Sequence, residues 1–148
     1  SFLILQRLQR AVQDRTTAHL KSLNLTDITP SQANVLMVLF QRRRPMSARD
    51  IHRELGVSEV TISRLVGTLV SNQWVAKTPD PKDGRAALLS PTKKARTHLP
   101  DFIQIANSLL DETFEGISHA ELSQLHSTIR RIDENLSTPH NPSAEHKT

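Results

Sequence analysis

The sequence predicts a mainly α-helical fold with one small β-hairpin. Apolar residues recur at intervals of three and four over most of the chain, which is the periodicity of helices that bury one face. Residues 47–72 contain two such segments, separated by the tight turn Gly56-Val57-Ser58. Two short runs, 74–78 and 86–89, flank a segment rich in Pro, Asp and Gly, as expected for the strands of a hairpin.

The first two helices are expected over residues 2–23 and from Pro30 to the basic run Arg42–Arg44. An apolar stripe marks the first helix, with Phe2, Leu3, Leu5, Leu8, Val12 and Leu20. Thr29, Pro30 and Gln32 mark the start of the second, because Thr29 can cap the helix, Pro30 suits its first turn and Gln32 completes a capping box.

The third helix begins after a capping box formed by Ser47 and Asp50, and it ends at Gly56. Ser58 caps a fourth helix over roughly 59–72. This helix has an inward apolar face and an outward face of small or polar residues. The inward residues are Ile62, Leu65, Val66, Leu69 and Val70, and the outward residues are Val60, Ser63, Arg64, Gly67 and Ser71.

Two more helices are expected after the hairpin. Pro91-Thr92 opens one over about 92–115, in which Pro100 introduces either a kink or a break. Ser118 and Glu121 form a capping box for the last one, which runs to about Leu136. Both carry apolar stripes: Leu99, Phe102, Ile103, Ala106, Leu109, Leu110 and Phe114, then Leu122, Leu125, Ile129, Ile132 and Leu136. Residues 137–148 are expected to be a disordered tail.

The composition excludes several classes of protein. No cysteine is present, so the chain has no disulfide framework, zinc ribbon or thiol redox sensor. The apolar runs are too short for a bilayer and the N-terminus lacks a signal-peptide layout, so we expect a cytoplasmic protein without a membrane partner. His119 and His126 are too far apart to chelate a metal together, and no catalytic motif is evident. We therefore predict no enzyme activity, no metal and no cofactor.

Charge is distributed unevenly along the chain. Residues 1–99 contain 16 Lys and Arg against 7 Asp and Glu, a net charge of +9. Residues 100–148 contain 3 Lys and Arg against 8 Asp and Glu, a net charge of −5. This asymmetry suggests that the first part meets a polyanion and the second does not, although many proteins are asymmetric by chance.

Two helices joined by a tight turn and followed by a basic hairpin predict a surface that reads duplex DNA. The outward face of the fourth helix has little bulk, which suits entry into a major groove about 12 Å wide. An ordinary helical hairpin in a core would explain the inward residues equally well, but not this outward face. The predicted DNA-binding residues are Ser58, Glu59, Val60, Thr61, Ser63, Arg64, Lys82, Asp83 and Arg85.

Individual roles follow from the side chains. Arg64 can bind a guanine edge or a phosphate, and Val60 can contact a thymine methyl group. Arg85 at the hairpin tip can enter the minor groove, where the potential is most negative. Lys82, Lys93 and the basic run Arg42–Arg44 can also neutralise phosphates.

Four motifs are shared with a known family. They are Thr29-x-x-Gln32, Leu55-Gly56-Val57-Ser58-x-x-Thr61-x-Ser63-Arg64-Leu65-Val66-x-x-Leu69, Asp83-Gly84-Arg85 and Thr92-Lys93-Lys94. On these residues the chain resembles the MarR family of winged helix-turn-helix transcriptional regulators, over residues 2 to about 136. Asn72-Gln73 and Pro91-Thr92-Lys93-Lys94-Ala95 depart from the family pattern at the two ends of the hairpin, away from the DNA face.

The resemblance implies a homodimer that binds a palindromic operator in double-stranded DNA. Residues 29–91 would form the winged DNA-binding lobe, and residues 1–28 and 92–136 would supply the dimerisation helices. Packing of the two C-terminal stripes against each other within one chain is the alternative to a dimer. The resemblance also implies repression of a promoter and release by a small-molecule effector, because the chain has no cysteine to oxidise. The alternative function is a winged-helix module for protein–protein contact that does not bind DNA.

Overall fold

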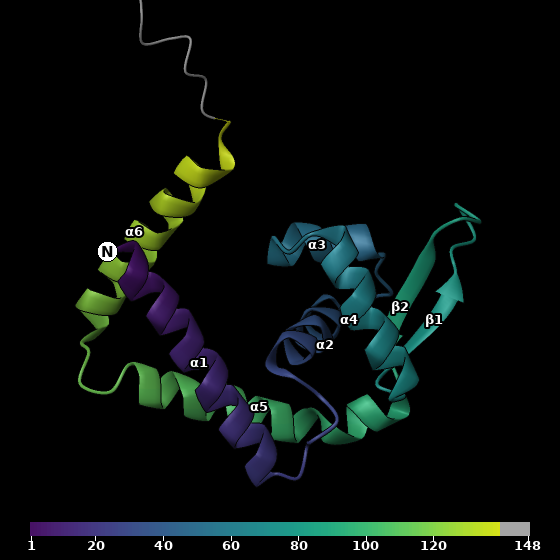
Figure 1. Cartoon of the computed structure of the whole chain (residues 1–148), viewed down its shortest axis with the longest axis horizontal. Coiled ribbons are helices and arrows are strands. Elements are labelled where there is room, and N and C mark those ends of the chain that lie inside the picture. Colours follow the sequence, from purple (N-terminus) through teal and green to yellow (C-terminus); the bar gives the residue numbers. More distant parts are fainter. Residues whose placement is uncertain (140–148) are drawn as a thin grey trace, which may run out of the picture. The chain divides into compact units, whose positions relative to one another are not determined.

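The computed structural model describes residues 1–139, and these form six helices and one two-stranded antiparallel sheet (Figure 1). In chain order the elements are α1 (Phe2–Ser22), α2 (Pro30–Arg42), α3 (Ala48–Leu55), α4 (Glu59–Ser71), β1 (Val75–Pro79), β2 (Ala87–Pro91), α5 (Lys93–Thr113) and α6 (His119–Ser137). The predicted fold class is confirmed. The chain divides into two compact units, residues 1–109 and a second unit that begins at Leu110. In the described part, every helix is too short or too polar to cross a membrane.

The helices begin at the predicted caps. The backbone N–H of Gln32 donates to the Thr29 hydroxyl at 3.3 Å, and the Gln32 side-chain oxygen accepts the Thr29 N–H at 3.0 Å. Equivalent reciprocal boxes begin α3, with Ser47 and Asp50, and α6, with Ser118 and Glu121. Each box satisfies N–H groups that a helix start otherwise leaves without partners, so four-residue motifs fix these boundaries locally.

The hydrophobic core of the first unit is formed by the C-terminal end of α1, by α2, α3 and α4, by the sheet and by the beginning of α5. Its fully buried side chains are Leu20, Val35, Leu36, Leu39, Met46, Ile51, Ile62, Leu69 and Trp74. The inward face predicted for α4 is confirmed, since Ile62, Val66 and Leu69 are buried and the other two residues are partly buried against the core.

Helix α5 bears on two expectations. It continues through Pro100, so of the two predicted alternatives the break does not occur, and the kink stays a prediction. Phe102 was predicted to belong to a stripe that needs a partner surface, but it is buried in the first unit, where its ring meets Trp74 edge-on at 5.7 Å. Ile105, which the sequence analysis left out of that stripe, is buried as well. The predicted stripe remains exposed at Ile103 and Leu110.

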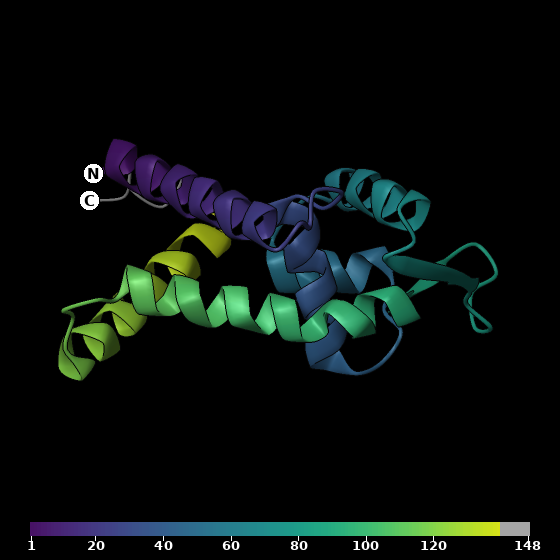
Figure 2. The same ribbon diagram turned by 90° about the horizontal axis from the view of Figure 1, so that it is seen from below.

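The two strands pair in antiparallel register, with Val75 opposite Pro91 and Pro79 opposite Ala87. Both lie about one residue later than predicted. Met46, in the link between α2 and α3, extends the sheet: its N–H donates to the Leu89 carbonyl at 3.0 Å, and its carbonyl accepts the Leu89 N–H at 2.8 Å. The hairpin therefore has a fixed base, while its tip projects away from the neighbouring helices (Figure 2).

Helices α1 and α6 carry large exposed apolar side chains. On α1 these are Phe2, Leu3, Ile4, Leu5, Leu8 and Val12, and on α6 they are Leu125, Ile129, Ile132 and Leu136. The last turn of α6 includes Ser137, so this residue is helical where a disordered tail was predicted. Residues 140–148 of that predicted tail lie outside the described residues.

Candidate nucleic-acid interface

The turn between α3 and α4 is fixed by three local hydrogen bonds. Gly56 has a φ of +68°, in the left-handed region that favours glycine, and its N–H donates to the His52 carbonyl at 2.8 Å. The Nδ1 atom of His52 lies 2.7 Å from the Val57 carbonyl. The Ser58 hydroxyl accepts the Thr61 N–H at 3.3 Å. These contacts set the direction in which α4 leaves the turn.

The outward face of α4 is open. Val60 is 82% exposed, and Ser63, Arg64 and Gly67 are exposed as well. Within residues 1–139, no hydrogen bond or ion pair engages the guanidinium of Arg64. Thr61 differs from its neighbours, because it is half-buried and its hydroxyl accepts a hydrogen bond from Ser58 at 3.0 Å. Thr61 therefore contributes mainly to the cap of α4.

The acidic residues of the hairpin tip order its backbone. Asp80 accepts the Lys82 N–H at 2.9 Å, and Asp83 accepts the Arg85 N–H at 3.1 Å. Side chains that bind the backbone two residues later stabilise tight turns. The Lys82 and Arg85 side chains remain exposed. Asp83 therefore shapes the tip that presents Arg85, although its own carboxylate would be repelled by a phosphate.

A groove with a volume of about 910 Å³ lies between α4 and the hairpin. It brings together four of the predicted residues, Glu59, Ser63, Asp83 and Arg85. The other predicted residues are outside its lining: Ser58, Val60, Thr61, Arg64 and Lys82. The candidate surface thus has two parts, the groove and the exposed face of α4 beside it.

Arg49 and Lys77 also line this groove, although neither is among the DNA-binding residues predicted from the sequence. Arg49 lies in the first turn of α3, and its Nε atom is 3.4 Å from the Glu59 carboxylate at the start of α4. Their separation of ten residues carries no recognisable spacing, so the pair becomes visible only once the two helices are placed. The sequence did show that Arg49 is a cationic residue in the first turn after the predicted cap Ser47.

The basic run at the end of α2 is largely occupied by ion pairs with α3. Arg42 pairs with Glu54, and Arg44 lies 3.8 Å from Asp50. A hydrogen bond from the Ser47 backbone lowers the pKa of Asp50, and the charges of Arg44 and Arg53 add to this effect. Exposed pairs of this kind contribute little to stability, so the arginines stay available for exchange with a phosphate.

A turn-linked helix pair, an exposed second helix and an ordered basic hairpin define a winged helix-turn-helix protein. In agreement, residues 28–95 match the family of winged helix DNA-binding domains. No curated protein matches the sequence of the chain.

Several solved structures share the fold. A MarR protein from Peptoclostridium difficile is 20% identical and has a TM-score of 0.82, with 91% of this chain and 86% of that chain covered. A mutant of MarR from E. coli, in complex with operator DNA, is 21% identical over 87% of this chain and 90% of that chain, with a TM-score of 0.77. The PcaV transcriptional regulator from Streptomyces coelicolor, in complex with its natural ligand, is 21% identical over 88% of this chain and 89% of that chain, with a TM-score of 0.76.

Residues 28–95 therefore match a winged helix DNA-binding domain, and the chain has the fold of solved MarR-family structures, in line with the resemblance found in the sequence.

Proposed function

We propose that the protein is a homodimeric repressor that binds a palindromic operator and is released from it by a small molecule. The observation that carries the DNA-binding part is the groove between α4 and the hairpin, with the open polar face of α4 beside it. Helix α4 would enter the major groove, and the hairpin would reach the flanking backbone or minor groove.

The predicted residues take distinct roles in this proposal. Arg64 and Ser63 read base edges, and Val60 contacts a thymine methyl group. Arg85 and Lys82 neutralise the DNA backbone, while Asp83 holds the tip in shape. The three residues at the start of α4 have mixed roles: Ser58 and Thr61 cap the helix beside a phosphate, and Glu59 faces the groove together with Arg49.

The apolar side chains exposed on the terminal helices support the dimer. Monomeric proteins rarely expose a run of large apolar side chains such as that of residues 2–12. In the second unit, α6 exposes an apolar stripe with helical spacing. Residues 100–148 have a negative net charge. Two copies would cover these faces and place two DNA-binding lobes on successive half-sites, about 34 Å apart, on the same side of the duplex. Residues 29–91 would then act as the DNA-binding lobe, and residues 1–28 and 92–136 as dimerisation helices.

Release by a small molecule is proposed from two facts. The chain contains no cysteine, so it has no thiol to oxidise. One of the similar structures, PcaV, holds its natural ligand. An effector that binds one arrangement of the two lobes better than the other would change their spacing, and with it the operator affinity.

A gel shift with genomic fragments, followed by sequencing of the retained DNA, tests the proposal. We expect one palindromic sequence to be enriched, and we expect its binding to fall steeply as salt is raised. Light scattering after size-exclusion chromatography should give twice the mass of one chain. A protein that retains no duplex at low salt would instead support the alternative, a winged helix for protein–protein contact.

A further inference from the structure

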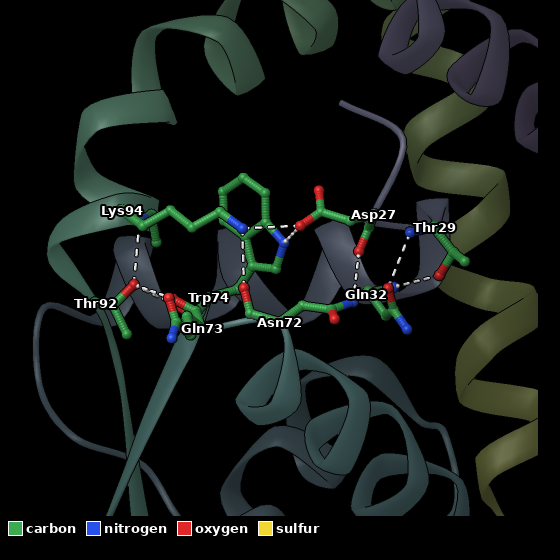
Figure 3. Close-up of polar contacts among 9 residues, drawn as sticks. Asp27, Thr29, Gln32, Asn72, Gln73, Trp74, Thr92 and Lys94 are labelled. Atoms are coloured by element: carbon green, nitrogen blue, oxygen red, sulfur yellow. Dashed lines mark hydrogen bonds and ion pairs between the residues drawn. The ribbon is translucent and has the colours of Figure 1, made fainter. Parts of the chain in front are cut away.

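Three segments that are distant in the sequence meet at Asp27, in the loop between α1 and α2 (Figure 3). The Asp27 carboxylate accepts hydrogen bonds from the indole N–H of Trp74 at 3.2 Å and from the Lys94 ammonium at 2.8 Å. Its backbone carbonyl accepts the side-chain amide of Asn72 at 3.0 Å. Asn72 and Trp74 lead into β1, and Lys94 follows β2, so both ends of the hairpin are tied to one loop residue.

The contacts around Trp74 explain why the aspartate is needed. The Trp74 side chain is fully buried, and a buried N–H without an acceptor costs free energy. Lys94 also lies over the indole ring, 4.2 Å from its centre, and the rings of His98 and Phe102 approach it edge-on at 5.4 and 5.7 Å. The Asp27 carboxylate thus accepts hydrogen bonds from both the indole N–H and the ammonium, and it holds Lys94 above the ring.

The charged form of Asp27 is favoured at this position. Partial burial alone would raise the pKa of Asp27, but the hydrogen bond and the charge of Lys94 outweigh it, so the pKa lies below its usual value of 3.8. The interaction is therefore an ion pair under ordinary conditions.

A second set of bonds closes the base of the hairpin. Thr92, directly after β2, donates its N–H to the Trp74 carbonyl at 3.1 Å, and its hydroxyl lies 2.6 Å from the Gln73 carbonyl. The Lys94 ammonium also donates to the Asn72 carbonyl at 2.9 Å. Gln73 has a φ of +63°, an uncommon conformation for a residue with a side chain, and these bonds hold it there.

The base matters because the hairpin acts as a lever. A five-residue strand is roughly 17 Å long at about 3.3 Å per residue, so a tilt of about 10° at the base moves the tip by about 3 Å. A displacement of that size exceeds the tolerance of a hydrogen bond. The position of Arg85 relative to α4 therefore depends on residues that lie far from the groove.

We propose that Asp27 is a positioning residue for DNA binding, which fixes the base of the hairpin through Trp74 and Lys94 and thereby sets the reach of Arg85. This proposal rests on the function proposed above, since Arg85 is taken to contact DNA. It goes beyond that function because Asp27 itself touches no DNA.

A double-mutant cycle separates positioning from simple stability. Asp27→Ala should weaken operator binding about tenfold in the parent and in an Arg64→Ala background, but less than about twofold in an Arg85→Ala background, where the hairpin contact is already lost. The operator affinity of Asp27→Asn, which keeps an acceptor for the indole N–H, should lie between the affinities of Asp27→Ala and the parent. An equal loss in all three backgrounds would contradict the proposal.

Hydrogen exchange tests the same idea without DNA. In Asp27→Ala, the amides of Asp80 and Thr92, which are bonded within the hairpin, should exchange about tenfold faster. The amide of Ile62 in α4 should be unchanged. Unchanged hairpin amides, or an equal acceleration at Ile62, would overturn the positioning role. If the parent retains no duplex DNA, the proposed function fails, while the exchange rates still decide whether Asp27 fixes the hairpin.

Discussion

Arg49 of α3 and Glu59 of α4 form an ion pair across the helix-turn-helix, with Nε 3.4 Å from Oε1. Both side chains are exposed, so the pair adds at most about 1 kcal/mol to stability. Its importance lies in its place on the groove, where an uncompensated carboxylate would repel phosphates.

This pair gives the first prediction. Arg49→Ala should weaken operator binding by about 1–2 kcal/mol, because it removes a cation and leaves the Glu59 carboxylate facing the DNA. Adding Glu59→Gln to that variant should restore part of the affinity. Fluorescence anisotropy of the two single variants and the double variant measures the coupling. If Glu59→Gln instead changes which base pair is preferred, the Glu59 carboxylate contacts a cytosine directly, and it is not only a repulsive charge that Arg49 compensates.

The second prediction concerns Arg64 and Arg85, the arginines proposed to contact DNA. Arg64→Ala and Arg85→Ala should each weaken operator binding by roughly 1–3 kcal/mol, with unchanged circular dichroism. Arg130→Ala, an exposed site on α6, is the matched control and should bind like the parent when light scattering shows an unchanged dimer. If both variants footprint the operator like the parent, the DNA-reading surface lies elsewhere.

Salt dependence separates phosphate contacts from base contacts. Lys82→Ala should weaken binding to all sequences by a similar factor, and the slope of log K against log salt should become shallower by about 0.9. Arg64→Ala should mainly relax the base preference. Titrations of operator and scrambled duplexes at several salt concentrations give both the salt slope and the preference for the operator. An unchanged slope for Lys82→Ala would show that Lys82 does not contact a phosphate.

Two glycines make a matched pair for stability. Gly56→Ala should lower the free energy of unfolding by about 1 kcal/mol, because a side chain is strained at a φ of +68°. Gly67→Ala, inside α4, should instead raise it by about 0.5–1 kcal/mol through helix propensity. An added Cβ meets nothing within 4 Å at either site, so backbone preference decides both outcomes. Chemical denaturation checks them, and equal effects would contradict the backbone argument.

Acid should weaken the start of α3. Hydrogen bonds from Ser47, together with the charges of Arg44 and Arg53, lower the pKa of Asp50 below 3.8 in the folded chain. Because the pKa is lower in the folded chain than in the unfolded chain, the ionised carboxylate stabilises the fold at pH values above the unfolded-state pKa. This stabilisation is lost as the pH falls through the folded-state pKa. Asp50→Asn should therefore melt at a lower temperature than the parent at about pH 7, with the difference shrinking as the pH falls below 3.8. Thermal melts with Asp133→Asn as the charge control test this, and a constant difference would contradict it.

The sequence predicted those parts of the fold that depend on neighbouring residues. Thr29 with Gln32 and Ser47 with Asp50 show why, since both capping boxes form within four residues. The two faces of α4 were predictable for the same reason, because helical spacing alone decides that Ile62 is inward and Val60 outward.

Features that depend on distant segments escaped prediction. Asp27 meets Trp74 and Lys94 across 47 and 67 residues, and no local pattern reports such a contact. Phe102 was misjudged for the same reason, since an apolar stripe does not reveal whether its partner is in the same chain. Of the candidate site, the residues on α4 and at the hairpin tip were named in advance, whereas the participation of Arg49 in the groove required the placed helices.

The two faces of α4 have a consequence for how this regulator can change. The apolar side chains that pack the helix into the lobe point inward, and the cap at its start uses Ser58 and Thr61. Val60, Ser63 and Arg64 point outward and support nothing else in the first unit. Replacing these three should retarget the protein to a different operator while its folding stays the same, so new specificities are accessible by few substitutions.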